Sequence, residues 1–475
     1  MTRGARPLVV DLDGTLLLTD LLHESVMALL RQSPVDAVRI PLWLMRGKAH
    51  LKSELAKRIN LDPATLPYNQ PFLDWLRTQR ASGRRLILAT ASDQRLAHQV
   101  AEHLGLFDAV LASDGRTNLA GDVKRQRLVE TMGAGDFVYA GNSGADLAVW
   151  QGASAAVVVN AKPTLARQAA RITSIECVHP PQPAGLGVWA KALRLHQWLK
   201  NLLIFVPALA AHRIWEGSLL LQAVAGFLAF SLTASSVYLL NDLLDLGDDR
   251  HHRSKRLRPF AAGRLSIAAG VLATPALLMV ALALASGLHW TFAVVLSAYY
   301  LLTMAYSFWL KRQVMLDVIT LAALYTLRII AGAAAVGVRP SFWLLAFSMF
   351  IFLSLALLKR YSELLELRRA GSLSKARGRG YHVEDLTLLM AFGATSGYAS
   401  VLVMALYLNS ADVVPLYREP RYIWLACPFL LYWISRAWLL AHRGEMHEDP
   451  VVFAARDKVS LIVALGLALM FWLAI

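Results

Sequence analysis

The sequence predicts a chain in two parts, a doubly wound α/β domain followed by an all-α polytopic membrane domain of about nine transmembrane helices. Up to about residue 185, short β-rich runs alternate with helical stretches, which is typical of a parallel sheet covered by helices. Beyond that point, apolar segments near the ~20 residues that cross a bilayer recur about nine times. Basic residues gather in every second loop between these segments, as the positive-inside rule predicts for a multi-pass membrane protein.

The composition excludes some classes of protein. The 475 residues carry a net charge of +15, but much of it lies in loops between apolar runs, where membrane topology accounts for it. We therefore expect no nucleic-acid partner. The two cysteines, Cys177 and Cys427, lie far apart in the two parts and offer neither a disulfide framework nor a zinc motif.

Polar residues accompany the predicted strands of the first part. These strands are "PLVV", "RLILA", "DFVYAG" and "AAVVVN", and ligands of such a sheet collect at the carboxyl ends of its strands. The polar residues expected at that edge are Asp11, Asp13, Thr90, Lys124, Asn142 and Asp146. The first apolar stretch is too short for a signal peptide and runs into acids, so we expect this part to stay in the cytoplasm.

The strings "VVDLDGTLL", "LILATASD", "GDVKRQRL" and "YAGNSGADL", in this order, resemble the haloacid dehalogenase superfamily, mostly phosphatases, over roughly residues 5–175. The resemblance implies that Asp11 is a nucleophile that forms an aspartyl-phosphate, and that Asp13 is the general acid and base. It also implies that Thr90 and Lys124 hold the phosphoryl oxygens and that Asp146 helps to hold Mg²⁺. Residues 20–80 would form a small helical cap within a domain of residues 1–178.

One position departs from this family. The first acid of the last motif is usually Asp, and here it is Asn142. An amide oxygen still ligates Mg²⁺, but one negative charge is missing. Two readings therefore stay open, a phosphatase with weaker metal binding and a retained fold that serves only as a scaffold.

A linker rich in Pro and Gly, residues 179–195, leads to the membrane domain of residues 196–475. The apolar segments lie near 198–212, 217–242, 266–286, 290–309, 316–337, 342–363, 386–408, 421–441 and 458–475. The loops after the second, fourth, sixth and eighth segments are basic, whereas the opposite loops carry little charge. This pattern predicts a protein of a bacterial-type inner membrane, with a cytoplasmic N-terminal domain and its C-terminus on the opposite side.

The stretch "NDLLDLGDDRHHRSKRLRP" ends the second segment with acids followed by bases. At about 100° per residue, Asp242, Asp245 and Asp249 fall within about 60° of one another on one helical face. Three crowded carboxylates repel unless a cation joins them, which predicts a Mg²⁺ site that carries substrate phosphates. The bases that would take the remaining phosphate charge are Lys255, Arg256 and Arg258. The alternative is a solvated acidic loop beside a basic loop that sets topology.

Cations in or beside the later segments extend this hypothesis. Arg328 lies eleven positions after Asp317, on nearly the same helical face and about 16 Å deeper along the fifth segment. An intramembrane Arg faces a cavity or pairs with a buried acid, and both readings stay open. We expect Tyr299 and Tyr306 to serve packing. Cations at the cytoplasmic ends of the fourth and sixth segments bind substrate or set topology, and they are Lys311, Lys359 and Arg360.

The string "NDLLDLGDD" fits the NDxxDxxxD motif of the UbiA-type prenyltransferase superfamily, and the resemblance covers residues 190–475. Within it, "HQWLKNLLIF", "DDRHHRSKRLRPFAAG", "LLKRYSELLEL" and "PVVFAARDKVSL" look most like the decaprenyl-phosphate phosphoribosyltransferase branch. The resemblance implies Mg²⁺-dependent transfer of 5-phosphoribose from phosphoribosyl diphosphate to a polyprenyl phosphate, with release of diphosphate. It adds Asn241 and Lys200 to the predicted substrate-binding residues.

A second acid motif, DxxxD, is usual in the aromatic prenyltransferases of that superfamily, but position 321, four after Asp317, is Leu. Phosphoribosyl diphosphate carries a second phosphate across the ribose, which calls for cations rather than more acids. The soluble domain would then remove the 5-phosphate from the lipid product, which tethering presents at a high effective concentration. The rival readings are an aromatic or quinone-type prenyltransferase and a phosphatase that the membrane part merely anchors.

Overall fold

The computed structural model describes residues 6–181, 185–371, 380–408, 417–446 and 449–474. The chain divides into two compact units that do not follow its order. The first unit joins Met1–Leu193 to Tyr238–Pro275, and the second joins Arg194–Val237 to Ala276–Ile475. The segment with the acidic and basic run therefore packs with the N-terminal domain, whereas the domain boundary predicted at residue 178 assigns it to the membrane domain.

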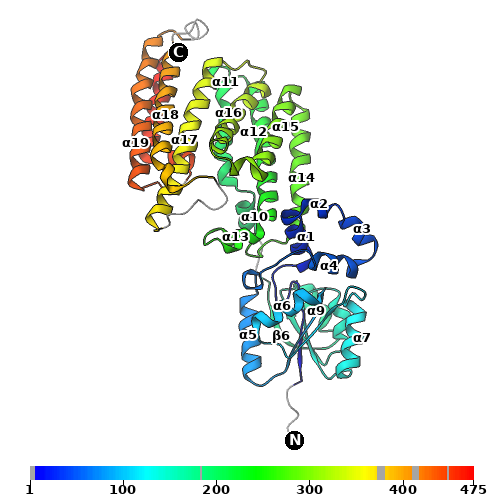
Figure 1. The fold of residues 1–475 in the computed structure, drawn as a ribbon. Coiled ribbons are helices and arrows are strands. Elements are labelled where there is room, and N and C mark those ends of the chain that lie inside the picture. Colours follow the sequence, from blue (N-terminus) through cyan, green and yellow to red (C-terminus); the bar gives the residue numbers. More distant parts are fainter. Residues whose placement is uncertain (1–5, 182–184, 372–379, 409–416, 447–448, 475) are drawn as a thin grey trace. The chain divides into compact units, whose positions relative to one another are not determined.

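A parallel sheet forms the centre of the first unit (Figure 1). It has six strands in the order β3-β2-β1-β4-β5-β6. Its strands are β1 (Leu8–Val10), β2 (Leu86–Asp93), β3 (Ala109–Ser113), β4 (Val138–Gly141), β5 (Ala155–Val159) and β6 (Ser174–His179). The chain winds outward from β1 in both directions, so β1 and β4 flank the switch point at which ligands of such sheets bind. The predicted doubly wound α/β fold is confirmed.

Side chains of the buried strands alternate between two apolar layers. Leu8 and Val10 of β1 belong to one cluster, and Val9 between them belongs to the other. A parallel strand that is covered on both faces reads as a continuous apolar run, as this one does. The helices that follow the cap are α5 (Gln70–Ala81), α6 (Gln94–Leu104), α7 (Gly121–Met132), α8 (Asp146–Trp150), α9 (Pro163–Ala169) and α10 (Leu186–Ala192).

Four helices between β1 and α5 form the cap. They are α1 (Leu21–Gln32), α2 (Pro34–Ala37), α3 (Ile40–Met45) and α4 (Lys48–Ala56), and Trp43 lies in their small apolar cluster. α1 begins after Asp20, whose carboxylate accepts hydrogen bonds from two backbone N–H groups of the first turn. The predicted cap of residues 20–80 includes α5, but this helix packs on the sheet through Phe72.

The helical part has seven helices, among the described residues, that are long and apolar enough to cross a membrane. They are α12 (Gly217–Leu244), α14 (Ile267–Ser286), α15 (Trp290–Phe308), α16 (Leu316–Ala335), α17 (Phe342–Arg369), α18 (Leu386–Leu408) and α19 (Ala426–Arg443). The pair α20 (Pro450–Arg456) and α21 (Lys458–Ala474), bent by 80°, makes an eighth if it counts as one span. The chain is a multi-pass membrane protein, and the predicted count of about nine transmembrane helices is corrected to seven or eight within the described residues.

The first predicted segment, residues 198–212, is not a long helix. Leu195–Phe205 forms a 3₁₀ helix, η2, and Val206–Ala210 forms a short α-helix, α11. η2 lies close against α16, because a Cβ on Gly332 would lie 2.0 Å from the carbonyl oxygen of Ile204. A side chain at this position would overlap the backbone of η2, so glycine is required there.

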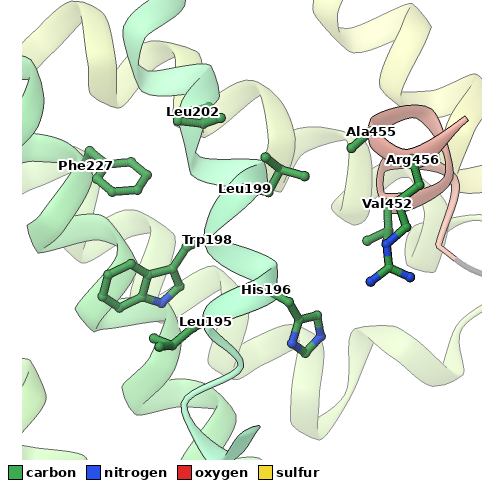
Figure 2. A pocket seen from close by; sticks show the side chains of 9 residues that line it. All are labelled: Leu195, His196, Trp198, Leu199, Leu202, Phe227, Val452, Ala455 and Arg456. Carbon is green, nitrogen blue, oxygen red and sulfur yellow. The ribbon is translucent and has the colours of Figure 1, made fainter. Parts of the chain in front are cut away.

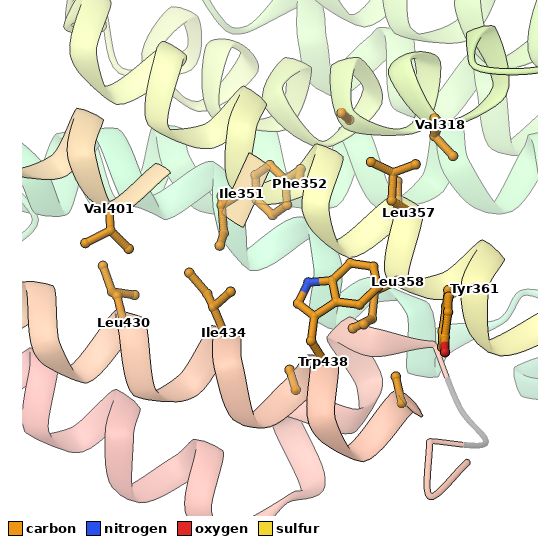
Figure 3. Packing of buried hydrophobic residues seen from close by; sticks show 14 of the residues in the cluster. Val318, Ile351, Phe352, Leu357, Leu358, Tyr361, Val401, Leu430, Ile434 and Trp438 are labelled. Atoms are coloured by element: carbon orange, nitrogen blue, oxygen red, sulfur yellow. The ribbon is translucent and has the colours of Figure 1, made fainter. Parts of the chain in front are cut away.

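An apolar core joins α16, α17, α18 and α19 (Figure 3). Val318 of α16, Leu357 of α17 and Ile434 of α19 belong to it. The indole of Trp438 enters the core, and its Nε1 donates a hydrogen bond to Ser354 Oγ at 3.1 Å, so the buried N–H group has a partner. This packing fixes α16 and α17, which carry several of the predicted cations.

Candidate functional sites

The predicted nucleophile lies at the carboxyl end of β1. Asp11 is buried, and its Oδ1 accepts a hydrogen bond from Lys124 Nζ at 2.7 Å. Lys124, on α7, also donates to the hydroxyl oxygen of Tyr139 at 2.9 Å, and this hydroxyl donates to Asp146 Oδ1 at 2.8 Å. The structure therefore brings Asp11, Lys124 and Asp146 together, with Tyr139 as a fourth member of one hydrogen-bonded chain.

Asp13 is held between the sheet and the cap. Its Oδ1 accepts a hydrogen bond from the backbone N–H of Leu21, the first residue of α1, at 2.8 Å. Its Oδ2 accepts from Ser92 Oγ at 2.6 Å and lies 3.4 Å from Thr90 Oγ1. Both hydroxyls come from β2, so the carboxyl group has a fixed orientation, as a general acid and base requires.

Asn142 follows β4 and lies against the nucleophile loop. Gly14 has a φ of +73°, and a Cβ there would lie 2.0 Å from Asn142 Nδ2, so this turn requires glycine. Asp146 Oδ2 accepts hydrogen bonds from the backbone N–H groups of Asn142 and Ser143, at 3.0 and 2.8 Å, and from Ser143 Oγ at 2.9 Å. Asp146 therefore fixes the loop that carries Asn142.

The charges at this edge of the sheet suit a divalent cation. Burial raises the pKa of Asp11 to about 7; Lys124 opposes this rise, and the charges of Asp146 and Asp13 add to it. Burial also raises the pKa of Asp13. The carboxylates of Asp11, Asp13 and Asp146, of which the first and last are buried, face the ammonium groups of Lys124 and Lys52. Negative charge is therefore in excess, and the available ligands are hard oxygens. This set fits Mg²⁺, and the residues that would hold it are Asp11, Asn142 and Asp146.

The acidic run lies where α12 ends. The helix stops one residue before Asp245, and a second helix, α13 (Leu246–His251), begins one residue after it, so the predicted single helical face does not continue through the segment. Asp242 and Asp249 nevertheless meet, because Arg258 Nη1 donates to Asp242 Oδ1 at 3.0 Å and to Asp249 Oδ2 at 2.7 Å. In this structure Arg258 is a partner of the acids.

The donor set of this segment also fits Mg²⁺. Burial raises the pKa of Asp249 to about 6, although Arg258 opposes the rise. The guanidinium lies between Asp242 and Asp249, where a metal cation would offset the same two charges. In the described part of the chain, no three carboxylate, imidazole or thiol groups converge as metal ligands, so the role of Asp242, Asp245 and Asp249 as Mg²⁺ ligands stays a prediction.

Asp245 faces the cap. Arg31 Nη2, near the end of α1, lies 3.3 Å from Asp245 Oδ1 and 3.5 Å from Asp248 Oδ2. The remaining predicted residues of this segment have other positions. Asn241 lies in the last turn of α12, and Lys255 and Arg256 lie on an exposed 3₁₀ turn, η3 (Lys255–Leu257).

Three predicted cations gather in the second unit. Lys200 Nζ, on η2, and Lys359 Nζ, on α17, both donate to Asp449 Oδ2 at 2.9 Å. Burial alone would raise the pKa of Asp449, but the two ammonium groups hold it below its ordinary value. Lys200 and Arg328 both lie over the ring of Tyr325, at 5.6 and 5.0 Å from its centre.

Arg328 is buried on α16 among uncharged partners. Its Nε donates to Asn201 Oδ1 at 2.8 Å, and its Nη1 donates to the carbonyl oxygen of Leu324 at 2.7 Å. Its guanidinium also faces the rings of Phe230 and Tyr299. Of the two readings of Arg328, this environment argues against an ion pair with a buried acid, and the cavity stays a prediction. Tyr299, expected to serve packing, is a partner of this cation.

Asp317 and Arg360 bind each other. Arg360 Nε donates to Asp317 Oδ2 at 2.5 Å and its Nη2 donates to Oδ1 at 3.0 Å, and both side chains are buried. The hydroxyl of Tyr306 donates to the same carboxylate at 2.7 Å, so this tyrosine has a polar role besides packing. The geometry supports a structural ion pair, and substrate binding by either residue stays a prediction. Lys311 lies on a 3₁₀ turn, η4 (Leu310–Arg312).

A groove of about 490 Å³ lies between η2 and α20 (Figure 2). Figure 2 shows His196 of η2 and Arg456 of α20 toward the right of the view and Phe227 and Leu202 toward its left. The remaining lining residues are Leu195, Trp198, Leu199, Val452 and Ala455. An apolar groove with basic side chains at one end suits an amphiphile with an anionic head group. Since Lys200 directly follows Leu199, the groove adjoins the cation cluster.

Sequence reasoning missed several members of these sites. Asp449 stands in "EDPVV", where an acid before Pro signals the start of a helix, but this string does not show that two distant lysines meet the carboxylate. Asn201 directly follows the predicted Lys200, yet its partner Arg328 comes from α16. Tyr139 lies inside a buried strand, where its hydroxyl gives no local signal.

Comparisons with known proteins assign both parts. The model of the UbiA prenyltransferase family matches residues 202–474, and that of the haloacid dehalogenase-like hydrolases matches residues 8–150. An uncharacterized protein of Sinorhizobium fredii is 42% identical over 98% of this chain and 91% of its own length. The decaprenyl-phosphate phosphoribosyltransferase of Mycobacterium tuberculosis is 32% identical over 60% of this chain and 93% of its own length. A solved UbiA homolog from Archaeoglobus fulgidus, bound to GPP and Mg²⁺, is 18% identical over 60% of this chain and 98% of that one, with a TM-score of 0.45.

Proposed function

The chain belongs to the UbiA prenyltransferase family and begins with a haloacid dehalogenase-like domain, and from this we propose that it catalyses two consecutive reactions. The membrane part transfers 5-phosphoribose from phosphoribosyl diphosphate to a polyprenyl phosphate. The soluble domain then removes the 5-phosphate from the lipid product. Both reactions use Mg²⁺ and take place at the cytoplasmic face of a bacterial inner membrane.

The cation cluster of the second unit carries this proposal. Among the described residues, Lys200, Lys359 and Arg328 bring three positive charges together, and Asp449 offsets one of them. An excess of charge in a largely buried place is costly unless a counter-ion joins it. A phosphate monoester supplies two negative charges and several acceptor oxygens. The 5-phosphate of the donor meets this demand, whereas a prenyl diphosphate carries charge at one end only. The similarity to decaprenyl-phosphate phosphoribosyltransferase supports the same donor.

We assign the diphosphate end of the donor to the acidic segment. Asp242, Asp245 and Asp249 would hold Mg²⁺, which stabilises the charge that develops on the leaving diphosphate. Arg258 now pairs with Asp242 and Asp249, so cation binding there would release its guanidinium. The diphosphate oxygens would then be its new partners.

We assign the acceptor lipid to the groove between η2 and α20. Its apolar lining suits the polyprenyl chain, and His196 and Arg456 suit the lipid phosphate. A phosphate oxygen of the lipid attacks the anomeric carbon from the face opposite the diphosphate. The bond from that carbon to the diphosphate oxygen breaks, and diphosphate leaves with the electron pair. The attacking oxygen is already ionised, so the protein positions the partners and stabilises charge without moving a proton.

The second reaction uses the chain of hydrogen bonds at β1 and β4. Asp11 attacks the phosphorus of the 5-phosphate and forms an aspartyl-phosphate, while Asp13 gives a proton to the departing ribose oxygen. Asp13 then takes a proton from water, which attacks the aspartyl-phosphate and releases inorganic phosphate. Lys124, which already binds Asp11, offsets the negative charge that gathers between phosphate and carboxylate.

The test is transfer by the purified full chain. Incubation with Mg²⁺, ribose-labelled phosphoribosyl diphosphate and a polyprenyl phosphate should give a labelled lipid and free diphosphate. Asp245→Asn should abolish the labelled lipid and leave hydrolysis of a generic phosphate ester as in the parent. A parent that transfers a geranyl group from geranyl diphosphate to an aromatic acceptor, and makes no ribosylated lipid, would contradict the proposed donor and acceptor.

A further inference from the structure

One helix of the cap contacts the acidic segment within the first unit. α1 carries Glu24 and Arg31 seven positions apart, which places them on the same helical face, two turns from each other. The partners of both residues lie in the stretch 245–250, at the end of the acidic run. The soluble domain therefore touches residues of the proposed transfer site.

The first contact is a buried ion pair. Arg250 Nη2 and Nη1 donate to the two carboxylate oxygens of Glu24, at 2.6 and 3.0 Å, and the two side chains are 5% and 2% exposed. Thr19 Oγ1 also donates to Glu24 at 2.7 Å, and Arg250 Nε donates to the carbonyl oxygen of Ala261 at 3.0 Å. A bidentate pair with these additional bonds fixes both orientation and distance, and Arg250 directly follows Asp249.

The second contact reaches the acids themselves. Arg31 lies 3.3 Å from Asp245 and 3.5 Å from Asp248, and its side chain is one-quarter exposed. Arg31 places a guanidinium beside Asp245, a predicted Mg²⁺ ligand. Arg258 does the same for Asp242 and Asp249. The difference is that Arg31 comes from the soluble domain.

The backbone of the two segments is also in close contact. Gly263 has a φ of +67°, and a Cβ on it would lie 2.6 Å from the Cβ of Leu18, in the loop between Asp13 and α1. The backbone N–H of Leu21, which begins α1, binds the carboxyl group of Asp13. A single helix therefore starts at the proposed phosphatase acid and ends at the acidic segment.

We propose that α1 is a structural part of the transfer site, in which Glu24 and Arg31 are positioning residues that hold the acidic segment ready for Mg²⁺ and diphosphate. The inference rests on the proposed function only in that this segment binds diphosphate. It predicts that transfer requires the soluble domain even when the chemistry of that domain is disabled. A phosphatase joined by a flexible linker would impose no such requirement.

The test measures binding of Mg²⁺ and inorganic diphosphate by heat unfolding of the full chain. All proteins carry Asp11→Asn, so that phosphatase chemistry is absent. Arg31→Ala should raise, by about fivefold, the diphosphate concentration that gives half of the maximal thermal stabilisation. Arg31→Lys should restore most of the lost affinity for diphosphate. The control is Arg39→Ala, which removes an exposed pair with Asp36 elsewhere in the cap and should change nothing. Arg31→Ala with parental or tighter binding would overturn the inference.

Glu24→Gln provides a second variant. It keeps the shape of the side chain but removes the charge that Arg250 binds, and it should weaken diphosphate binding more than Arg31→Ala does. Its control is Glu54→Gln, which removes a cap carboxylate paired with Lys57 and Arg58. If Glu24→Gln does not fold, the Arg31 series decides. In the transfer assay, Arg31→Ala should raise KM for the donor about fivefold and keep kcat within about twofold.

Diphosphate alone is the ligand because both phosphoribosyl and prenyl donors release it. Mg²⁺ and diphosphate could stabilise the parent protein although the parent transfers no phosphoribosyl group. In that case the donor in the proposed function is wrong, and the comparison of the Arg31 and Glu24 variants still decides the role of α1. If they do not stabilise the parent at all, the acidic segment does not bind diphosphate and the inference is overturned.

Discussion

At the scale of single residues, two buried arginines of the membrane part have opposite surroundings. Arg360 is neutralised by the carboxylate of Asp317, whereas the hydrogen bonds of Arg328 go to an amide oxygen and a carbonyl oxygen. A paired guanidinium has little charge left for a ligand. Arg328 has no carboxylate among its described partners, so we propose that it serves the substrate, whereas Arg360 serves the fold.

Arg328→Ala should therefore impair transfer far more than folding. Removing the partner of a buried phosphate typically costs about 2–5 kcal/mol, which appears here as lost transition-state stabilisation. Arg360→Ala is the matched control, because it removes the guanidinium that neutralises the buried Asp317 and should lower the free energy of unfolding by about 3–5 kcal/mol. Transfer per folded molecule and heat unfolding measure the two effects. The opposite pattern would make Arg328 the structural residue.

Asn142 is the residue that decides between our two readings of the soluble domain, a phosphatase with weaker metal binding and a scaffold. Its amide already lies against Gly14 beside the nucleophile loop, so Asn142→Asp changes charge with little change in shape. The variant should need less Mg²⁺ for half of its phosphatase activity, because a carboxylate binds this hard cation better than an amide does. Titration of Mg²⁺ against hydrolysis of a generic phosphate ester measures this. If parent and variant are equally inert on every ester, the soluble domain is a scaffold.

At the scale of elements, four of the six strands could be predicted, whereas β3, β6 and the end of α12 could not. "VVDLDGT" places Asp11 and Asp13 after a buried strand, and parallel strands bring their carboxyl ends to one edge, so Asp11, Lys124 and Asp146 meet as expected. At a constant angle per residue, the acidic run is predicted to be one helix. In the structure the helix breaks at Asp245, and this residue lies beside Arg31 of the cap. Arg31 precedes Asp245 by more than two hundred residues, so this contact leaves no local signal in the acidic run.

The first membrane segment shows the same limit of prediction, because its apolar residues do not reveal that it is a 3₁₀ helix.

The length of this segment bears on the membrane topology. Eleven residues of η2 rise about 2.0 Å each and five residues of α11 about 1.5 Å each, which gives roughly 30 Å, enough for the hydrocarbon core of a bilayer. Met1–Leu193 and the segment after α12 share one unit, so an even number of crossings separates them. α12 supplies one crossing, and η2 with α11 would supply the other.

This topology predicts that the loop between α11 and α12 lies outside the cell. Trp215→Cys, made in a chain whose two cysteines are replaced by serine, should react with a membrane-impermeant thiol reagent on intact cells. Ser254→Cys, in the loop after α12, should react only after the membrane is opened. Labelling of both positions from the same side would exclude a crossing by η2.

At the scale of the whole molecule, the two proposed active sites on one chain predict an order of products. The proposed transferase product carries the 5-phosphate that the phosphatase would remove, so loss of one site should reveal the intermediate. Asp11→Asn should make the labelled lipid accumulate with its 5-phosphate in place and leave the rate of transfer unchanged, because only the nucleophile is removed. Mass analysis of the extracted lipid distinguishes the two products. Phosphate release that survives Asp11→Asn would assign the second reaction to another group.

The first unit is built from two separate stretches of the sequence, and this affects how it folds during synthesis on the ribosome. Glu24 and Arg250 lie 226 positions apart, so the acid is synthesised and exposed long before its basic partner exists. Domains generally fold as units while the chain is still emerging, and the sheet and cap can do so. The ion pair can form only after α12 has entered the bilayer and returned the next segment to the same side. The soluble unit is therefore complete only after α12 has been inserted into the membrane. In a chain whose insertion stops earlier, Glu24 of α1 does not meet Arg250.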